Sequence, residues 1–438
     1  MSNYVFYQMK LTALSPLAIG SGENANTDHD VIRDGSGEPF IPASSLAGVL
    51  RDMLPKDDAD KLFGALSANA SRIIVGDAFS LDTLKTGVTV RDSVALDEYK
   101  VARKGMKFDR EIVEAGGEYE AILELPNKIE SHAKDGSNDN TDYAALLDSL
   151  LSRAIRDGIS VGAKTTRGYG RLAVKVKKVE KSGGDWYKFD PYCEDSWKSA
   201  ATIHAASETD SNITTYTMQL KLKDALSIRS YDIEAVHGED ETAPDFTATV
   251  NSSGRPVIPG TSWAGAFRHR YAQFIEGADG AKEKAVRALF GWVNPKKKDA
   301  VNQTEERSAD TQNSDKQEDV IQRSRITFSE TVFEEGSYHI KQITRTAISR
   351  FSGGASDSAL YTENTCYGGT GKMKICVKDI TEEEKKLLEY CILDLHNGFL
   401  SIGGLGSVGR GLFEVTGLSI NGKAYKVGEE GFTDAKQS

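Results

Sequence analysis

The chain lacks the residue patterns from which most metal and disulfide sites are built. It has four cysteines in 438 residues, with no CxxC pair, and its seven histidines form no HExxH motif or other ligand spacing. A zinc site and a disulfide framework are therefore not expected, and we expect reduced thiols. No apolar run approaches the roughly 20 residues of a membrane span, and no signal-peptide pattern opens the chain. These absences predict a cytoplasmic protein without membrane contact.

The chain also lacks an excess of positive charge. Its 54 basic and 65 acidic residues give a net charge of −11. Because phosphate binding needs local cations, this balance argues mildly against a nucleic-acid partner. Many acidic residues cluster in apparent loops such as 305–319, so a local basic surface is still compatible with the total.

One segment of the chain occurs twice. Asp28–Arg51 reads DHDVIRDGSGEPFIPASSLAGVLR, and Asp245–Arg268, 217 residues later, reads DFTATVNSSGRPVIPGTSWAGAFR. The two segments align without a gap. A repeat of this length indicates that one folding unit has been duplicated, and the chain is long enough for two domains of roughly 200 residues.

The repeat continues beyond this segment. Leu62–Gly64 matches Leu289–Gly291, Ser71–Ile73 matches Ser324–Ile326, and Arg91 falls opposite Arg345. Between these anchors the second half carries an additional polar stretch, which predicts a mobile insertion at 292–322. We expect a first domain at 1–180, a linker at 181–214 and a second domain at 215–438.

Each half shows the same order of predicted elements. Residues 215–223 alternate apolar and polar side chains, which indicates a half-buried strand, and residues 4–14 are the counterpart. Pro42 opens a predicted helix whose apolar residues keep i, i+3, i+4 spacing. A glycine-rich turn and a strand close each half, at 160–176 and 401–415. This order favours an α+β fold of two tandem ferredoxin-like domains.

The two glycine-rich turns carry positive side chains. Lys164, Arg167 and Arg171 belong to the first turn and Arg410 to the second. Glycines let the backbone approach a ligand closely and present several N–H groups, which suits phosphates. Packing alone could also shape such turns, and the two interpretations are about equally favoured. The second turn fits GxGxxG at 404–409, but a strand follows it, so a dinucleotide site is not expected.

The loop of the first repeat holds three aspartates, Asp28, Asp30 and Asp34, whose counterparts in the second repeat are Asp245, Thr247 and Asn251. Loop aspartates are most often turn or capping residues, and we expect Asp34 and Asn251 to hold the turn before the following glycine. Only Asp28 has an acidic counterpart. If the duplicated function is acidic, Asp28 and Asp245 are the candidates to orient a nucleophile, act as a base or hold a cation. His29 has Phe246 as its counterpart, so a catalytic role common to both halves is not expected for it.

These motifs together resemble the RAMP superfamily of CRISPR-associated proteins, in particular the backbone subunits of type III effector complexes. The resemblance rests on the loop aspartate, the segment that opens a helix, Leu-Phe-Gly, and the terminal glycine-rich turn. The helix-opening segment reads Gly-x-Pro-x-Ile-Pro-x-Ser-Ser in the first half and has Thr-Ser at its end in the second. Two such units in one chain are similar to the tandem subunits of type III-D-like systems. The resemblance implies RAMP domains with RRM-like sheets.

The resemblance also implies a set of RNA contacts. The helix start and the glycine-rich turn would follow the phosphates of the guide crRNA, and a projecting hairpin would separate the guide–target duplex at intervals. We place these hairpins at 96–113 and 350–366. The expected RNA-binding residues are Arg33, Ser44, Ser45, Arg51, Arg91, Lys104, Lys107, Lys164, Arg167, Arg171, Thr261, Ser262, Arg268, Arg345, Arg350 and Arg410.

In active members of this family, the loop aspartate promotes cleavage of the bound target RNA. The resemblance therefore implies that Asp28 and Asp245 are catalytic, with attack of a 2′-hydroxyl on the adjacent phosphate assisted by a divalent metal, expected to be Mg²⁺. Its protein ligands are not identified by the sequence. The loop that holds Asp245 lacks the Val-Ile-Arg found after Asp28, and Glu239, Asp240 and Glu241 are alternative acids.

Three functions are compatible with the sequence. The first is a crRNA-binding backbone subunit with endoribonuclease activity in antiviral defence. The second is the same subunit without catalysis, and the third is a crRNA-processing endonuclease, which would be expected to use a histidine base. The implied partners are guide crRNA, target RNA, further RAMP backbone subunits and the large polymerase-like subunit.

Overall fold

The computed structural model describes residues 4–22, 27–65, 70–81, 87–96, 102–126, 141–207, 212–230, 244–275, 277, 279–293, 321–428 and 431–434. The chain divides into two compact units. Unit 1 comprises Met1–Thr165 and Tyr169–Ser211, and unit 2 comprises Thr166–Gly168 and Asn212–Ser438. Of the insertion expected at 292–322, residues 294–320 lie outside the described residues, and its two ends, Trp292–Val293 and Ile321–Gln322, pair as short strands. No helix among the described ranges is long and apolar enough to cross a membrane.

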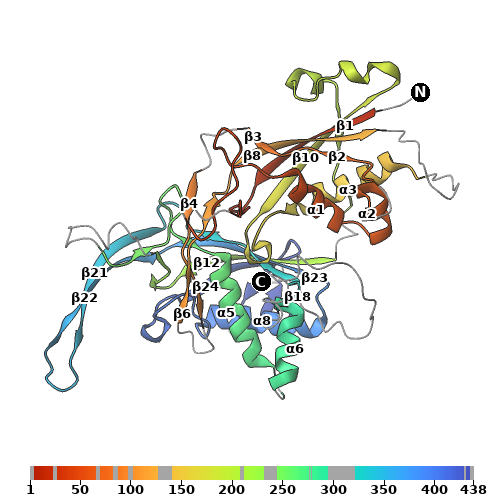
Figure 1. The fold of residues 1–438 in the computed structure, drawn as a ribbon. Coiled ribbons are helices and arrows are strands. Elements are labelled where there is room, and N and C mark those ends of the chain that lie inside the picture. The colour runs from red at the N-terminus through yellow and green to blue at the C-terminus, as the bar shows by residue number, and fades with distance from the viewer. Residues whose placement is uncertain are drawn as a thin grey trace, which may run out of the picture. The chain divides into compact units, whose positions relative to one another are not determined.

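Unit 1 is built on an antiparallel sheet in the order β11-β10-β1-β8-β2, with β3 beside β8 and β9 beside β10 (Figure 1). The strands are β1 (Tyr4–Ala13), β2 (Ile74–Val75), β3 (Phe79–Ser80), β8 (Glu118–Pro126), β9 (Ile159–Ser160), β10 (Arg171–Lys181) and β11 (Ala201–Ile203). Its α-helices, within the described ranges, are α1 (Ala43–Asp52), α2 (Lys56–Phe63) and α3 (Tyr143–Asp157). The strand predicted at 4–14 is therefore confirmed as β1.

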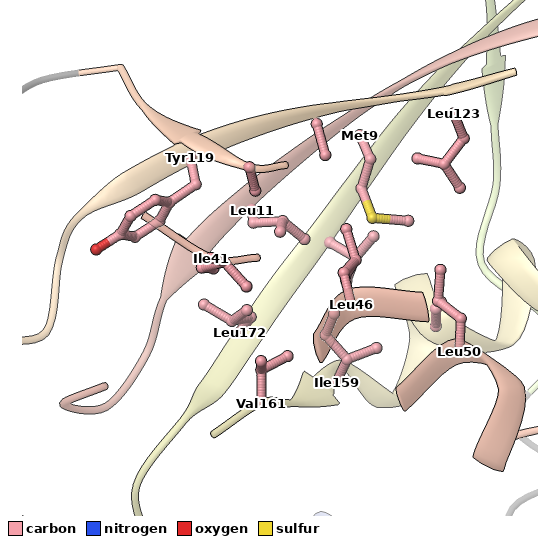
Figure 2. Close-up of a cluster of buried hydrophobic side chains, with 14 of the residues drawn as sticks. Met9, Leu11, Ile41, Leu46, Leu50, Tyr119, Leu123, Ile159, Val161 and Leu172 are labelled. Atoms are coloured by element: carbon pink, nitrogen blue, oxygen red, sulfur yellow. The ribbon is translucent and has the colours of Figure 1, made fainter. Parts of the chain in front are cut away.

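The main core of unit 1 lies between this sheet and its helices. Figure 2 shows Met9 and Leu11 of β1 pointing toward Leu46 and Leu50 of α1, with Leu123 of β8 beside them. All five side chains are buried. Because successive strand side chains alternate between faces, the odd-numbered residues of β1 enter this core and the even-numbered ones point to the other face of the sheet.

The stretch expected to be a linker is folded for most of its length. Two 3₁₀ helices, Gly183–Lys188 and Glu194–Trp197, precede β11, which pairs with β10. Trp197 is buried against Phe6 and Ile122 on the second face of the sheet. This aromatic packing explains why a polar, aperiodic sequence is held in unit 1, whose last residue is Ser211.

Unit 2 repeats the design with an antiparallel sheet in the order β19-β23-β12-β24-β25-β26. Its strands are β12 (Ile213–Leu222), β19 (Ile326–Phe328), β23 (Thr370–Lys378), β24 (Phe413–Ile420), β25 (Lys423–Val427) and β26 (Phe432–Asp434). The main helices are α5 (Gly260–Phe274), α6 (Asp279–Phe290) and α8 (Glu382–Asn397). The alternation at 215–223 is confirmed, because Tyr216, Met218, Leu220 and Leu222 are all buried in the unit 2 core.

The two units are equivalent element by element. β1, β8 and β10 correspond to β12, β23 and β24, and α1, α2 and α3 correspond to α5, α6 and α8. Both α1 and α5 begin directly after a proline, Pro42 or Pro259, whose fixed backbone angle favours the first turn of a helix. The expected α+β fold of tandem ferredoxin-like domains is thus the observed one.

A hairpin outside the main sheet extends from each unit. In unit 2 it is formed by β21 (Tyr338–Ile348) and β22 (Ala355–Gly368), the long blue ribbon in Figure 1, with Phe351 fully exposed in its turn. In unit 1, β5 (Ser93–Leu96) pairs with β6 (Ala102–Phe108), and β4 (Val88–Val90) pairs with β7 (Glu111–Val113). Both hairpins are larger than expected, since the predictions at 96–113 and 350–366 leave out most of each first arm.

Short strand pairs join the hairpins and loops to the rest of unit 2. They involve β13 (Ala225–Leu226), β14 (Arg229–Ser230), β15 (Thr247–Ala248), β16 (Val257–Ile258), β17 (Trp292–Val293), β18 (Ile321–Gln322) and β20 (Thr331–Val332). β13 pairs with β22, and β14 pairs with β15. The loop that contains Asp245 lies against the inner half of the hairpin, where Phe246 bridges Glu363. This inner half, from the Tyr338–Gly368 pair to the Thr344–Thr362 pair, forms the base of the hairpin.

Candidate nucleic-acid interface

Asp28 is joined to the base of the unit 1 hairpin by two reciprocal hydrogen bonds. The Asp28 backbone N–H donates to Oδ1 of Asp109 at 2.7 Å, and the Asp109 backbone N–H donates to Oδ2 of Asp28 at 3.0 Å. Asp28 is exposed, and Asp109 lies directly between β6 and β7. The carboxylate therefore both faces solvent and fixes the loop to the hairpin.

Asp245 occupies the equivalent place in unit 2. Its backbone N–H donates to the Thr362 carbonyl oxygen at 2.8 Å, and the Thr362 N–H donates to Oδ2 of Asp245 at 2.7 Å. Asp245 is exposed, like Asp28. In both units the aspartate carboxylate thus accepts a backbone N–H of the hairpin, with Thr362 at the position of Asp109. The second bond differs, because the N–H of Asp28 donates to a side chain and that of Asp245 to a backbone carbonyl.

The other loop polar residues are structural, as expected for the turn. Oδ1 of Asp34 accepts the N–H groups of Ser36 and Glu38, and Oδ1 of Asn251 accepts those of Ser253 and Arg255. These bonds confirm that Asp34 and Asn251 hold the turn. Asp30 is buried and accepts two hydrogen bonds from Thr27. The alternative acids Glu239, Asp240 and Glu241 lie outside the described residues.

The strand pairing corrects one match in the repeat. The residue after Asp109 is Arg110, which pairs with Arg91, whereas Glu363, after Thr362, stands opposite Ile343. Arg91 therefore corresponds to Ile343, and Arg345 corresponds to Ser93. A shift of two residues keeps every side chain on the same face of a strand, so the alternation of the sequence does not distinguish the two registers.

Several polar groups surround Asp28. Nζ of Lys164 lies 4.3 Å from the centre of the Phe108 ring, and the His29 ring meets the same ring edge-on at 6.2 Å. Burial and the neighbouring Arg110 and Lys164 cations lower the pKa of His29, while Asp28 and Asp109 partly oppose this shift. The structure therefore gathers a histidine and a lysine near Asp28. Sequence comparison between the halves missed His29 because Phe246 replaces it.

A different cluster lies near Asp245. The buried carboxylate of Glu363 makes ion pairs with Arg229, Arg345 and Arg410. The Arg229 guanidinium also lies 4.6 Å from the centre of the ring of Phe246, the residue after Asp245. Arg229 and Glu363 were not among the candidates from the sequence, since neither belongs to a repeated motif.

The groups that could coordinate a divalent cation differ between the surroundings of Asp28 and those of Asp245. No point in the described ranges gathers three or more histidine, cysteine, aspartate or glutamate side chains. Mg²⁺ is commonly held by one or two carboxylates, with water and substrate phosphates completing the shell. Asp28 and Asp109 supply two carboxylates and fit that pattern. Asp245 has Thr362 in place of the second carboxylate, so the donor set of unit 2 fits less well.

Besides Arg345 and Arg410, four more of the predicted RNA-binding arginines are tied to protein groups. Arg91 is buried in an ion pair with Glu114 at 2.9 Å, Arg171 donates to the Asp157 carbonyl oxygen, Arg51 pairs with Asp60, and Arg33 pairs with Glu111 at 3.4 Å. Burial lowers the pKa of the Arg268 guanidinium. In these positions the guanidinium stabilises the fold through its protein partner, independently of any contact with RNA.

Other predicted contacts lie at the surface. Ser44, Lys107, Arg167 and Arg350 are exposed, whereas Ser45, Lys164, Thr261 and Ser262 are partly exposed. The Lys104 side chain lies outside the described residues. The N-terminus of α1 already has an acidic partner, because Oδ1 of Asp77 accepts the Ala43 N–H at 2.6 Å. This carboxylate opposes an anion at that helix end.

A shallow depression beside α1 brings two of these residues together. It has a volume of about 330 Å³ and is lined by Ala43, Ser44, Ala47, Gly48, Arg51, Phe63, Ser71, Ile73 and Val75. The small side chains of α1 open the surface here, and Ser44 and Arg51 provide its polar groups. The depression therefore places the start of α1 and Arg51 side by side, and both belong to the segment that occurs twice in the sequence.

The glycine-rich turns have the same backbone geometry in both units. Gly170 and Gly411 have φ angles of +77° and +72°, and a Cβ atom added there would lie 2.0 Å and 1.9 Å from the carbonyl oxygens of Val161 and Ile402. Lys164 and Leu405 occupy equivalent left-handed positions, with φ angles of 55° and 60°. Packing of the turn therefore requires glycine at one equivalent position in each unit, Gly170 and Gly411.

Comparison with models of protein families gives a match that covers most of the chain. The RAMP superfamily model matches residues 10–173 and again residues 223–414. The two matched regions fall mainly in unit 1 and unit 2, respectively. A search of curated proteins gives no match.

Proposed function

The chain belongs to the RAMP superfamily as a two-domain CRISPR RAMP protein, and from this membership we propose that it is a crRNA-binding backbone subunit of a type III effector complex that cleaves its bound target RNA. The tandem arrangement favours a complex of the type III-D-like kind. Its partners are guide crRNA, target RNA, further RAMP subunits and a large polymerase-like subunit.

One observation supports cleavage above the others. In both units an exposed loop aspartate accepts a backbone N–H at the base of a projecting hairpin, at Asp109 and Thr362. A hairpin with an exposed aromatic side chain such as Phe351 is suited to enter a duplex and displace a base pair. We expect a displaced nucleotide to lie along the hairpin, where the carboxylate could reach the phosphate next to that nucleotide.

The residues of unit 1 suggest how the reaction proceeds. The 2′-oxygen of the displaced nucleotide attacks the adjacent phosphorus, the 5′-oxygen leaves, and a 2′,3′-cyclic phosphate forms. Asp28 orients the 2′-hydroxyl and accepts its proton, and Lys164 near Phe108 offers positive charge to the phosphate oxygens. Asp28 and Asp109 would hold a Mg²⁺ ion, which when bound would stabilise the negative charge of the transition state.

Binding of the guide is supported by the exposed cations and by the glycine-rich turns. Arg167 and Arg350 are exposed, and the turns keep the same backbone shape in both units. Guide binding is expected to depend strongly on salt, because each phosphate contact releases counterions. The net charge of −11 then belongs to surfaces that face water or other protein subunits.

Cleavage by the reconstituted complex tests this function against a purely structural subunit. We expect Asp28→Asn combined with Asp245→Asn to lower the single-turnover rate by on the order of 10² or more, with RNA binding retained. Asparagine is preferred to alanine because its amide oxygen can still accept the N–H of Asp109 or Thr362.

Asp195→Asn is the matched control, since this exposed carboxylate makes an ion pair with the equally exposed Lys198 at 2.9 Å. Unchanged cleavage by the double variant would reject the aspartates as catalytic groups. Absence of cleavage by the unaltered complex would instead identify the chain as an inactive crRNA-binding subunit.

A further inference from the structure

Three guanidinium groups surround one buried carboxylate in unit 2. Nη2 of Arg410 lies 2.7 Å from Oε1 of Glu363, Nη2 of Arg345 lies 3.4 Å from the same oxygen, and Nη2 of Arg229 lies 3.6 Å from Oε2. The side chains of Glu363 and Arg410 are only 3% and 5% exposed. Those of Arg229 and Arg345 are 28% and 32% exposed.

Among the residues that the structure describes, the charges of this cluster are not balanced. Arginine stays protonated in proteins, so three positive charges face the single negative charge of Glu363. Like charges held together in a partly buried place repel one another unless an anion joins them. Even with the nearby Asp245 included, the positive charges exceed the negative ones. An anion bound beside the partly exposed Arg229 and Arg345 would reduce the repulsion among the three guanidinium groups.

The fold does not require this cluster, as its counterpart in unit 1 shows. The positions equivalent to Arg229, Arg345, Glu363 and Arg410 are Gly20, Ser93, Arg110 and Tyr169, respectively. Unit 1 forms the same hairpin base and the same glycine-rich turn without them. The cluster is therefore an addition specific to unit 2, which points to a ligand rather than to stability.

We propose that Arg229 and Arg345 bind a phosphodiester group of RNA at the base of the β21–β22 hairpin, with Glu363 and Arg410 holding the two guanidiniums in place. The planar guanidinium donates two parallel hydrogen bonds to phosphate oxygens. Arg229 is further oriented by Ser227, whose Oγ accepts its Nε–H at 3.1 Å, and by the ring of Phe246.

The bound phosphate belongs to the target strand, because the cluster adjoins the candidate cleavage residue. Phe246 follows Asp245 directly, and Glu363 follows Thr362, the hydrogen-bond partner of Asp245. The site thus rests on the proposed function and refines it: unit 2 holds the target phosphate with arginines, where unit 1 offers a second carboxylate, Asp109, and Lys164.

Salt-dependent binding measures the contacts directly. The probes are guide RNA titrated onto the full chain, and target RNA titrated onto the guide-loaded complex, each over a series of salt concentrations. We expect Arg229→Gln and Arg345→Gln each to reduce the slope of log affinity against log salt by about 0.7 to 0.9 in the target measurement. The guide measurement should not change.

Arg287→Gln is the matched control, because it makes the same charge change at an arginine paired with one exposed carboxylate, Glu283. Thermal midpoints check that each variant folds. Should a glutamine variant unfold, Arg345→Lys replaces it: the charge stays, so the slope stays, while loss of the paired hydrogen bonds weakens target binding.

The outcomes separate this inference from the proposed function. A slope that falls in the guide measurement would overturn the assignment to the target strand. Unchanged slopes in both measurements, or equal changes in Arg287→Gln, would overturn the site while leaving RNA binding intact. If the unaltered chain and complex bind neither RNA, both the site and the proposed function are wrong.

Discussion

At the scale of single residues, the repeated aspartates have two roles that the sequence does not separate. The sequence identifies Asp28 and Asp245 as the acidic pair in the repeat, but not their hydrogen bonds to Asp109 and Thr362. Those partners lie 81 and 117 residues away along the chain. Since an alanine would remove both the carboxylate charge and the bond to the hairpin, only the asparagine variants isolate the chemistry.

The arginine cluster shows a second limit at this scale. Arg345 and Arg410 were expected to bind RNA individually, whereas the structure joins them through Glu363. A buried glutamate in a strand gives no sign of its partners in the sequence, because burial and pairing depend on how distant strands meet. The sequence therefore predicted that these arginines are functional cations, but not that they form one cluster around Glu363.

The cysteines allow a direct check of residue environments. Burial raises the pKa of Cys366 to about 12 and also raises that of Cys391, whereas Cys193 is exposed. A raised pKa leaves a thiol protonated, and therefore unreactive, at neutral pH. We expect iodoacetamide to alkylate Cys193 in the folded protein and to leave Cys366 and Cys391 unmodified, as measured by peptide mass spectrometry. Rapid labelling of Cys366 under native conditions would contradict the packing of the hairpin base.

At the scale of elements, the strands, helices and turns followed the sequence closely. The alternation in β12 and the proline before α1 and α5 were sufficient to place these elements. The hairpins were harder; in unit 2, for example, β21 is mostly exposed and shows no core-facing alternation. The exact register between the halves also could not be predicted, since a shift by two residues preserves the alternation.

The glycine-rich turns yield a prediction at this scale. Gly409 and Gly411 both have positive φ angles, but a Cβ atom at Gly409 meets open space, whereas one at Gly411 would lie 1.9 Å from the Ile402 carbonyl oxygen. Gly409→Ala should lower the free energy of unfolding by about 1–2 kcal/mol, the cost of a left-handed alanine. Gly411→Ala should lower it considerably more, because the backbone must also move. Urea titration of the full chain compares the two, and equal effects would contradict the close packing of this turn.

At the scale of the whole molecule, duplication was the strongest signal in the sequence. The repeat predicted two units of one fold, and both units have the expected sheet, helices and glycine-rich turn. The stretch expected to be a linker was not recognised as folded, because its packing depends on one tryptophan, Trp197, rather than on a periodic pattern. The lack of an apolar period in this stretch thus indicated irregular structure, but did not indicate that the stretch is unfolded.

Duplication also gives the function an internal comparison. Each unit presents an aspartate at a hairpin base, but the surroundings have diverged: His29, Asp109 and Lys164 lie near Asp28, whereas arginines and Glu363 lie near Asp245. The two aspartates have different neighbouring residues. A substitution at one aspartate is therefore expected to change the reaction of its own unit and to leave that of the other unit unchanged.

The central claim is that each unit cleaves the target RNA at its own aspartate. The most direct measurement is a sequencing gel of end-labelled target RNA after single turnover by complexes carrying Asp28→Asn or Asp245→Asn. We predict that each single variant loses one distinct product while the other product forms at its normal rate. If both products persist in each variant, or if Asp28→Asn alone abolishes both, the claim of two independent cleavage sites is contradicted.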